Sequence, residues 1–538
     1  MPELVLGPIQ RFADETCATV WVETDAACEV SVLDTSARTF CVHGHHYALV
    51  DISGLEPGET HPYEVALDGR RVWPAPDDPY PQPVIRTRGG RDTRITFGSC
   101  RGAAPMEPPW TSDKEGLGPD ALLAYAQRML HADASAWPDL LLLLGDQVYA
   151  DDASPQTREF IRSRRDVSQP PGEEIADFDE YTHLYRESWS EPLVRWLLST
   201  LPVAMIFDDH DVIDDWNISQ RWVADMRATD WWERRIVGAF VAYWIYQHLG
   251  NLSPEDLADD ALYRKVRELD DAGPVLDQFA HDADRDPVVM RWSFDRQLGD
   301  THLLVVDSRA ARVLEEGHRD MLDEDEWGWV EERLNEPARR LLIASSLPIV
   351  MPRSLHDVER LNQWIAGGGW GARAAEVAER MRRKFDLEHW PAFPDSFARL
   401  MRLISDLVDQ PDPPRSITLL SGDVHHAYVS RLDIGDGGCP VHQVVASPLR
   451  QSVTPAVMRI YRVGVGAVGR WLGRRLTGLA GLEPPPVEWE RITEPLFANH
   501  IATLDSTTAG THLHIETAHQ TRPSGPGELQ SAVDLQLV

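Results

Sequence analysis

The chain has 538 residues, of which 43% are hydrophobic and 26% are charged, values typical of an ordinary globular protein. This length exceeds the size at which a single core usually stops growing, so two or more domains are expected. The net charge of −34, from 52 basic and 86 acidic residues, argues against nucleic acid as a partner, because most of the surface would repel it.

Residues 1–88 predict an N-terminal β-sandwich domain. Thr19–Glu23 (TVWVE) and Glu29–Leu33 (EVSVL) alternate between apolar and polar side chains, which is the period of a half-buried strand. Residues 52–60, followed by Tyr63, resemble the corner of a fibronectin type III sandwich, in which a tyrosine packs back over the turn. A fibronectin III-like sandwich is therefore expected at this end of the chain.

Residues 92–482 predict an α/β domain, because apolar strands alternate with helical segments. Helices are expected at Pro119–His131 and Asp325–Arg333. The segment of about residues 157–269 is rich in tryptophan and helix formers, and it predicts a helical insertion around one core strand at Val203–Phe207. Packing of helices against the core is the favoured role of its tryptophans over stacking on a substrate.

Residues 487–538 predict a C-terminal β tail. Ile501–Leu504 and Thr511–Glu516 have the composition of short strands. We expect this tail to pack on the core of the preceding domain.

The sharpest local reversal of charge lies at residues 459–476. This stretch carries five arginines, and no acidic residue occurs between residues 451 and 482. A helix here would be basic and amphipathic and suited to weak contact with an anionic membrane surface, where each basic residue contributes about 1 kcal/mol. Its four glycines weaken a free helix and favour a helix packed beside the site, with its arginines paired to the protein's own carboxylates or facing an anionic substrate.

The compartment is expected to be the cytoplasm. The five cysteines are odd in number and lack CxxC spacing, which argues against a disulfide framework and a four-cysteine zinc site. No apolar run approaches the roughly 20 residues that span a bilayer. The opening MPELVLGPIQRF has neither a basic region followed by a long apolar stretch nor a twin arginine, so no export signal is expected.

Four apolar strands each lead directly into side chains that can bind metals. The most pronounced is Leu140–Leu144, five leucines followed within a few residues by Asp146 and Tyr149. Open α/β sheets place their ligands at the carboxyl ends of strands, where loops converge. The other three strands lead into Cys100, into Asp208–Asp211 and into Asp423–His426. One such ending is ordinary, and four together argue for a metal site.

These residue types suit a hydrolytic site with two metals. Carboxylates bind hard cations, and a ferric ion also tolerates phenolate and thiolate. Asp146 can bridge two metals, which at a spacing of about 3.5–4 Å can clamp a phosphoryl group and activate a water. His210, between Asp209 and Asp211, is suited to protonating or stabilising the leaving group, and we assign catalytic roles to His210 and Asp211.

Each of these residues has a simpler explanation when taken alone. An aspartate after a strand most often caps a helix. A cysteine such as Cys100, taken alone, is most often a small buried apolar side chain. For His210 taken alone, a buried histidine with satisfied hydrogen bonds is as common as a functional one. Capping does not explain why Cys, Asp, Tyr and His all follow apolar strands directly. The joint pattern favours the metal site.

Six motifs, taken in order, resemble the alkaline phosphatase D (PhoD-like) family of metallophosphoesterases, within the calcineurin-like superfamily. They are FGSCR, LLGDQVYADD, FDDHDVIDDW, VVDSRAAR, LLSGDVHHA and ASPLR, and they cover roughly residues 92–455. LLGDQVY and LSGDVHH are specific as a pair, and a β-sandwich ahead of the catalytic domain also fits this family. The resemblance implies a calcineurin-like four-layer α/β/β/α core, a metallophosphatase domain at 92–482, and phosphoester hydrolysis.

The resemblance also implies the metals and their ligands. Asp209 and His210 match the Asn-His pair of the superfamily, and Asp208 is the competing candidate for the ligand. Fe³⁺ and Ca²⁺ are the metals implied, with other divalent metals as alternatives. The residues implied for Fe³⁺ are Cys100, Asp146, Tyr149 and His425, and those for Ca²⁺ are Asp146 as the bridge, Asp209 and Asp423.

The chain departs from the pattern at one strand end. Gly98–Cys100 replaces the Asp-x-His that opens the superfamily's motifs, which supports the narrower family. Arg101 stands where the family commonly has glutamine. Arg101 and Arg309 can each hold a phosphate bidentately or serve as an ion-pair partner, and together with His426 they are the candidate substrate-binding residues.

We therefore expect a phosphomonoesterase or phosphodiesterase that acts on a small-molecule or lipid phosphoester through a metal-activated water. The alternative is a non-catalytic, metal-containing binding or scaffold protein that uses the β-sandwich as an interaction module. His210 and all six candidate ligands are present, which argues against a protein that has lost activity. The sequence indicates no obligate protein partner.

Overall fold

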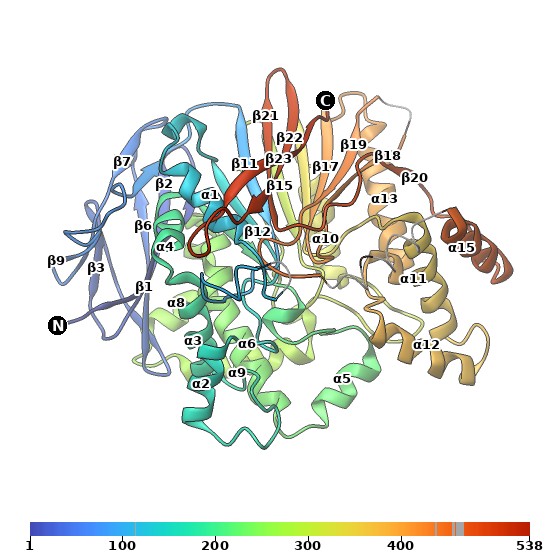
Figure 1. The fold of residues 1–538 in the computed structure, drawn as a ribbon, viewed down its shortest axis with the longest axis horizontal. Helices are drawn as coiled ribbons and strands as arrows, with labels where there is room; N and C mark the ends of the chain where they lie inside the picture. The colour runs from blue at the N-terminus through green and yellow to red at the C-terminus, as the bar shows by residue number, and fades with distance from the viewer. Residues whose placement is uncertain (113–114, 436–437, 454–457, 459–466) are drawn as a thin grey trace.

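The computed structural model describes the chain except for residues 113–114, 436–437, 454–457 and 459–466. Two large sheets form its centre, a β-rich region lies on one side of them, and helices surround them (Figure 1). In the described part of the chain, no helix is long and apolar enough to cross a bilayer.

The N-terminal region is built from two four-stranded sheets with the orders β1-β2-β6-β5 and β4-β3-β8-β9, and from the pair β10-β7. Valines of β2, β3 and β6 share one core, so the two sheets pack face to face. The strands are β1 (Leu4–Ala13), β2 (Cys17–Thr24), β3 (Glu29–Val32), β4 (Thr35–Arg38), β5 (Phe40–Val42), β6 (His45–Ser53), β7 (Thr60–Pro62), β8 (Val65–Leu67), β9 (Arg70–Trp73) and β10 (Val84–Arg86).

The expected tyrosine corner is wrong. The hydroxyl of Tyr63 donates to the carbonyl of Ser199 at 2.6 Å, in helix α4 (Pro192–Thr200), and does not close back on its own turn. The hydroxyl is buried, so it needs an acceptor, and the nearest one belongs to the helical layer. Tyr63 therefore attaches the N-terminal region to the rest of the molecule.

The six-stranded sheet has the order β13-β12-β11-β21-β22-β23. Its first three strands are parallel, and β21 pairs antiparallel with β11. All five leucines of β12 are buried, as expected for a strand covered on both faces. The strands are β11 (Thr93–Gly98), β12 (Leu140–Leu144), β13 (Val203–Ile206), β21 (His500–Thr507), β22 (Gly510–His519) and β23 (Glu528–Gln536).

The seven-stranded sheet has the order β14-β15-β16-β17-β19-β18-β20, with β15, β16, β17 and β19 parallel. Alternate residues of β15 point to opposite faces: Leu303 and Val305 join the core shared with the six-stranded sheet, and Leu304 and Val306 pack under helices. The strands are β14 (Phe294–Leu298), β15 (Thr301–Val306), β16 (Arg340–Ser345), β17 (Ser416–Ser421), β18 (Tyr428–Asp433), β19 (Val441–Val445) and β20 (Glu488–Arg491).

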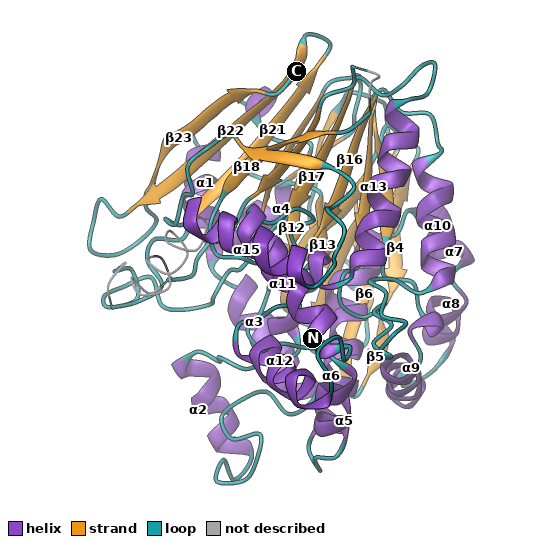
Figure 2. Cartoon of the chain, turned by 90° about the vertical axis from the view of Figure 1, so that its right-hand side faces the viewer, coloured by secondary structure: helices purple, strands orange, loops and turns teal. Residues whose placement is uncertain are grey.

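The C-terminal strands correct the expectation of a tail packed on the core. β21, β22 and β23 form half of the six-stranded sheet (Figure 2). β20 closes the edge of the other sheet (Figure 1). The backbone of β11 is the reason, because it has one edge against β12 and offers its other edge to β21. Residues 487–538 are therefore structural members of both sheets.

Helices cover the outer faces of the sheets. Helix α1 (Ala121–Met129) lies on the six-stranded sheet, where the hydroxyls of Tyr125 and Thr96 are 3.0 Å apart, and Asp120 caps its first turn. Helices α10 (Glu324–Leu334) and α13 (Pro394–Val408) lie on the seven-stranded sheet. The expected helices at 119–131 and 325–333 are thus confirmed as α1 and α10.

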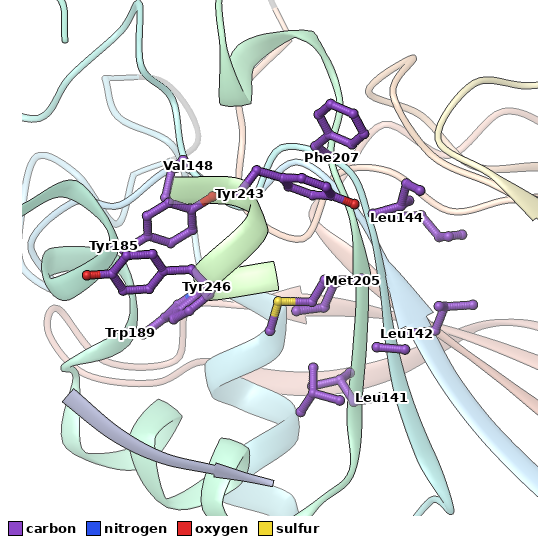
Figure 3. Packing of buried hydrophobic residues seen from close by; sticks show 14 of the residues in the cluster. Leu141, Leu142, Leu144, Val148, Tyr185, Trp189, Met205, Phe207, Tyr243 and Tyr246 are labelled. Carbon is purple, nitrogen blue, oxygen red and sulfur yellow. The ribbon is translucent and has the colours of Figure 1, made fainter. Parts of the chain in front are cut away.

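The segment around β13 is helical, as its composition indicated. Its aromatic side chains pack into the core, with the rings of Tyr185 and Tyr246 stacked 4.4 Å apart (Figure 3). The elements are α2 (Pro155–Arg164), α3 (Phe178–Trp189), α4, η2 (Asp209–Asp211), α5 (Gln220–Arg227), α6 (Trp232–Tyr243), η3 (Trp244–His248), η4 (Leu249–Asn251), α7 (Pro254–Asp259) and α8 (Ala261–Glu268), followed by α9 (Gly273–Arg285).

Three further helices flank the carboxyl end of the seven-stranded sheet: α11 (Arg353–Ala366), α12 (Ala372–Lys384) and α15 (Ala467–Leu479). Both α12 and α15 pack against α11. The short turns η1 (Ala134–Ala136), η5 (Pro287–Val289) and η6 (Trp390–Ala392) complete the elements of the described chain. Within the basic stretch 459–476, residues 459–466 lie outside the described residues, and the remainder belongs to α15.

Candidate active site

The four strand ends meet at one place between the two sheets. β11, β12 and β13 of one sheet and β17 of the other lead into it. Cys100, Asp146, Asp423 and His425 all have positive φ, at 57°, 51°, 66° and 51°. Side chains other than glycine rarely adopt this conformation, and it clusters where a site demands an exact direction. The backbone therefore turns sharply at each of these four residues to aim its side chain.

The first group of potential metal ligands consists of Cys100, Asp146 and His425, whose donor atoms lie within 4.8 Å of one another. The hydroxyl of Tyr149 is 3.5 Å from Oδ2 of Asp146. The Ser447 hydroxyl donates to Sγ of Cys100 at 3.1 Å, which orients the sulfur. A thiol, a carboxyl, a phenol and an imidazole thus converge on one buried point.

Two further groups overlap with the first. One ligand atom each of Asp146, Asp209 and His210 lies within 4.8 Å of the others. The ligand atoms of Asp208, Asp209 and Asp423 form a third group by the same criterion. Asp146 belongs to two groups, as a bridging ligand must. Its Oδ1 is buried and accepts no hydrogen bond from the described residues. A buried carboxylate oxygen without a donor is costly, and a cation would satisfy it.

Asp208 and Asp209 have different surroundings. Oδ1 of Asp208 accepts the Asp209 N–H at 3.1 Å and also pairs with the guanidinium of Arg309, and the residue is fully buried. Asp209 instead lines the pocket at the site. Only Asp209 of the two lines the pocket, but Oδ2 of Asp208 is also buried without a hydrogen-bond partner in the described chain, so both keep an oxygen for a cation.

Burial and the crowding of acidic groups disfavour the ionised forms of several site residues. Burial raises the pKa of Asp146 and of Asp208 well above the usual range, and neighbouring aspartates add to this. Burial likewise raises the pKa of Asp209 to about 6, and raises those of the Cys100 thiol and the Tyr149 phenol well above their ordinary values. Positive charge placed among these groups would reverse the shifts.

His425 and His426 sit at the same strand end. Burial lowers the pKa of His425 to about 4 and that of His426 to about 3, so both rings are neutral near pH 7. A neutral imidazole is the form that binds a metal. His426 lines the pocket with its ring 5.3 Å from the rings of Tyr428 and Phe497.

His210 projects into the pocket from the turn after β13. Its Nδ1 lies 2.9 Å from Asp151, and its ring centre is 4.6 Å from that of Tyr149. Burial alone would lower the pKa of His210, but Asp151, Asp209 and Asp146 outweigh it and raise the pKa well above its ordinary value. The imidazole is therefore held in one orientation by a carboxylate behind it.

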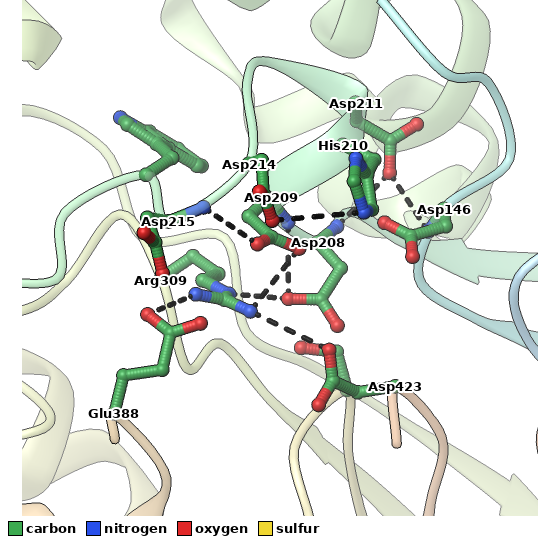
Figure 4. A network of polar contacts seen from close by, with 12 residues as sticks. Asp146, Asp208, Asp209, His210, Asp211, Asp214, Asp215, Arg309, Glu388 and Asp423 are labelled. Carbon is green, nitrogen blue, oxygen red and sulfur yellow. Dashed lines mark hydrogen bonds and ion pairs between the residues drawn. The ribbon is translucent and has the colours of Figure 1, made fainter. Parts of the chain in front are cut away.

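Asp211 does not line the pocket, in contrast to the catalytic role assigned to it. Its Oδ2 accepts the N–H groups of Asp146 at 3.0 Å and Asp208 at 2.9 Å (Figure 4). Its Oδ1 accepts from the Gln247 amide at 3.1 Å. Both oxygens are occupied by the protein itself. The structure thus places Asp211 as a residue that positions two ligand-bearing turns.

The two arginines considered for substrate binding are engaged by carboxylates. Arg101 pairs with Asp120 at 2.8 Å and donates to the Ser188 carbonyl, and it does not line the pocket. Arg309 is fully buried among the site carboxylates, 3.2 Å from Asp209 and 2.6 Å from Glu388 (Figure 4). Their geometry corresponds to the ion-pair alternative.

Several site residues were not singled out from the sequence. His389 lies 3.1 Å from Asp423 and 2.9 Å from Glu359, and it lines the pocket. Asp151 orients His210, and Glu388 pairs with Arg309. Asp151 lies inside the LLGDQVYADD motif, so that motif carried a signal for it. His389 and Glu388 follow α12 and no apolar strand, so the strand-end pattern could not find them.

The pocket at the site has a volume of about 300 Å³. Its polar lining includes Asp146, Asp209, His210 and Asp423. Apolar side chains also line it, among them Met351, Leu355, Phe385, Leu387 and Val424. A larger hollow of about 970 Å³ lies over α3, α6 and α9 and contains none of the strand-end residues.

Comparison with protein-family models gives two matches. Residues 123–461 match the model described as PhoD-like phosphatase, and residues 1–85 match a domain of unknown function (DUF7800). The first match covers more than half of the chain and begins after Cys100. No curated protein sequence shows a significant match to the chain.

The solved structures that are similar to this chain include the following two. One is a structure of PhoD, which is 13% identical, with 98% of this chain and 88% of that chain covered and a TM-score of 0.59. The other is purple acid phosphatase PPD1 from yellow lupin (Lupinus luteus) seeds, which is 11% identical, with 98% and 73% covered and a TM-score of 0.47. The first shows a shared mixed α/β fold, and the second is too distant to support an argument.

Proposed function

Because the chain belongs to the PhoD-like phosphatase family, we propose that it hydrolyses phosphoesters, either monoesters or diesters, at the pocket between the two sheets. The observation that carries the proposal is the convergence of four strand ends on Asp146, whose buried Oδ1 has no donor in the described chain. A site that only bound an anion would present donors, whereas this one presents acceptors. Acceptors of this kind call for cations, and cations in turn bind a phosphoryl group.

The fold fits the proposal at the level of architecture. We propose a calcineurin-like four-layer core, supported by α1 outside one sheet and α10 and α13 outside the other. We also propose a metallophosphatase domain that takes in 92–482 together with strands β20 to β23. The two packed sheets of the N-terminal region support a fibronectin III-like sandwich at 1–88 ahead of it.

The donors present suit the two metals in different ways. Cys100, Asp146, Tyr149 and His425 would hold Fe³⁺, since this set mixes thiolate, phenolate and imidazole with a carboxylate. Asp146, Asp209 and Asp423 would hold Ca²⁺, since they offer oxygen only. When bound, such metals polarise phosphoryl oxygens and lower the pKa of a bound water.

The protein's own groups have defined tasks in this proposal. His210 faces the pocket with Nδ1 held by Asp151, so Nε2 is the atom that stabilises or protonates the leaving oxygen. Asp211 keeps the Asp146 and Asp208 turns in register. His389, between Glu359 and Asp423, fixes the orientation of the Asp423 carboxylate.

Metal analysis combined with hydrolysis of aryl phosphomonoesters and phosphodiesters tests the proposal. Asp146→Ala and Asp423→Ala should lose bound metal and hydrolysis together, because each change removes a ligand. His210→Ala should keep the metal and lower kcat by about 10² to 10⁴. Asp152→Ala is the matched control, because Asp152 lies in the same motif but is exposed and pairs with Arg158.

The outcomes separate the alternatives. Metal-loaded wild-type protein that hydrolyses none of the esters would support the non-catalytic binding protein instead. An Asp146→Ala variant with full activity and full metal content would contradict the site. For the metal itself, phenolate or thiolate bound to Fe³⁺ gives a visible absorption band that Tyr149→Phe should shift or bleach. Colourless, fully active protein would remove Tyr149 and Cys100 from the ligands.

A further inference from the structure

Large apolar side chains are exposed on the helices beside the pocket. On α12, Val377, Met381 and Phe385 just after its end are 47%, 44% and 55% exposed. A spacing of four residues places them on one face of the helix. Phe385 also lines the pocket, so this apolar stripe runs to the entrance of the site.

The apolar surface extends onto the neighbouring helix. Trp471 and Leu479 on α15 are 59% and 79% exposed. Both α12 and α15 pack against α11, and the three helices lie together on the side that faces the viewer in Figure 2. Leu355 of α11 lines the pocket as well. We call this surface the three-helix face. Clusters of exposed apolar side chains of this kind mark interaction sites.

The charge of the three-helix face is opposite to that of the molecule. Its exposed basic residues are Arg373, Arg380, Lys384, Arg474 and Arg475, and they outnumber the exposed acidic residues Glu376 and Asp386, in a chain whose net charge is −34. Arg475 lies over the ring of Trp471 at 5.4 Å, and Lys384 lies over Phe385 at 5.4 Å. Basic and aromatic side chains therefore alternate on one surface, which is the composition of a helix that lies in the interface of an anionic membrane.

The exposed apolar side chains and the basic charge of the three-helix face together indicate the kind of partner that it binds. An apolar partner alone would leave the five cations unmatched, and a soluble anion alone would leave the tryptophan and the α12 stripe in water. An anionic lipid surface matches both, and the strongly acidic remainder of the molecule would be repelled from it, which fixes the orientation. The pocket then opens toward the lipid at Phe385.

We propose that the three-helix face docks on an anionic lipid bilayer and that the substrate is a phosphoester carried by a lipid. The phosphate would be held by the cations that Asp146, Asp209 and Asp423 would bind, and the part of the lipid next to it would lie along Met351, Leu355 and Leu387. The substrate class rests on the proposed function, whereas docking on the bilayer does not require hydrolysis.

Sedimentation with phosphatidylglycerol or phosphatidylcholine vesicles over a salt series tests the docking. The full-length protein should bind phosphatidylglycerol vesicles at low salt, release them as salt rises, and bind phosphatidylcholine weakly. Arg474→Gln/Arg475→Gln should weaken binding about 25-fold, at about fivefold for each basic residue near the surface. Val377→Ser/Met381→Ser should weaken binding at every salt concentration, because it removes the apolar contact.

Val288→Ser/Val289→Ser is the matched control, since these valines are 54% and 43% exposed on η5, outside the three-helix face. Hydrolysis of a soluble aryl phosphodiester should be unchanged in all three variants. If the proposed function fails, this hydrolysis is absent while vesicle binding persists, so the two failures are distinguishable.

Three results would overturn the proposal. The first is no binding of the wild-type protein to phosphatidylglycerol vesicles at the lowest salt. The second is equal weakening by the control pair. The third is self-association that Val377→Ser/Met381→Ser abolishes, in a protein that does not bind vesicles, because a second copy would then cover this face.

Discussion

Burial in the core holds individual side chains in protonation states that they would not have in water. His248 lies at the end of η3 with its ring centre 5.0 Å from that of Trp292. Burial, together with Arg291 and Arg11, lowers its pKa to about 3. The ring is therefore neutral in the folded protein at pH values where an unfolded chain would protonate it.

The direction of the pH effect follows from this difference. Between pH 6.5 and pH 3 the unfolded chain binds more protons at His248 than the folded protein, so its contribution to stability is complete above 6.5 and is lost as the pH falls. We expect His248→Phe to reduce the slope of unfolding free energy against pH in this window, by up to about 1.4 kcal/mol per pH unit. Denaturant unfolding at several pH values measures this, with the exposed His131→Gln as the control. An unchanged slope would contradict it.

At the scale of elements, β1 is tied to the amino end of β13 and to η3. The guanidinium of Arg11 on β1 is fully buried and donates to the carbonyls of Val203 at 3.1 Å, Tyr246 at 2.5 Å and Gln247 at 2.6 Å. Val203 begins β13, which leads into the turn Asp209–Asp211, and the other two carbonyls belong to η3. One side chain of the N-terminal region thus satisfies three acceptors where β13 and η3 meet β1.

Replacing Arg11 tests this support. Arg11→Met keeps most of the apolar stem but leaves three buried carbonyls without their donor, so we expect the free energy of unfolding to fall by about 3 kcal/mol. Denaturant unfolding gives the value, and Arg38→Met is the control because Arg38 is exposed on β4. A loss no larger than that of the control would show that other donors or water replace the guanidinium.

At the scale of the whole molecule, the N-terminal region and the two large sheets share one core. Trp21, Tyr47 and Leu49 belong to the same buried cluster as the leucines of β12, although the region has a second core of its own. The Tyr47 and Tyr246 rings are 5.6 Å apart across this contact. The interface is apolar, so the region does not behave as a loosely attached module.

A fragment that begins at Gly90 keeps every candidate ligand and removes this interface. We expect it to aggregate or to lose fixed tertiary structure, because Tyr246 and Trp196 would be exposed and Arg11 would be missing. Near-ultraviolet circular dichroism, light scattering and metal content report the outcome. A monomeric fragment with a native spectrum and full metal content would show that the site forms without the N-terminal region.

Much of the site could be predicted from sequence because its signals are local. The apolar run of β12 and the residues after it are adjacent in the chain, so strand and ligands appear in one short window. The same holds for Cys100, Asp209, Asp423 and His425, which the structure brings into overlapping groups of potential ligands, and for helices α1 and α10. Local periodicity and the rule that ligands gather at strand ends were sufficient there.

Only the tertiary structure decided which partners distant residues find. From the sequence, Arg101 and Arg309 could each bind a phosphate or form an ion pair. The structure places Asp120 beside Arg101, and it places Glu388 and Asp209 beside Arg309. His389 reaches Asp423 from a segment with no strand before it, and β21 reaches β11 across about 400 residues. Such contacts depend on how elements pack, and a sequence pattern records only what lies within one element. The sequence by itself determined which side chains stand at the strand ends, and packing decided which of them face the pocket.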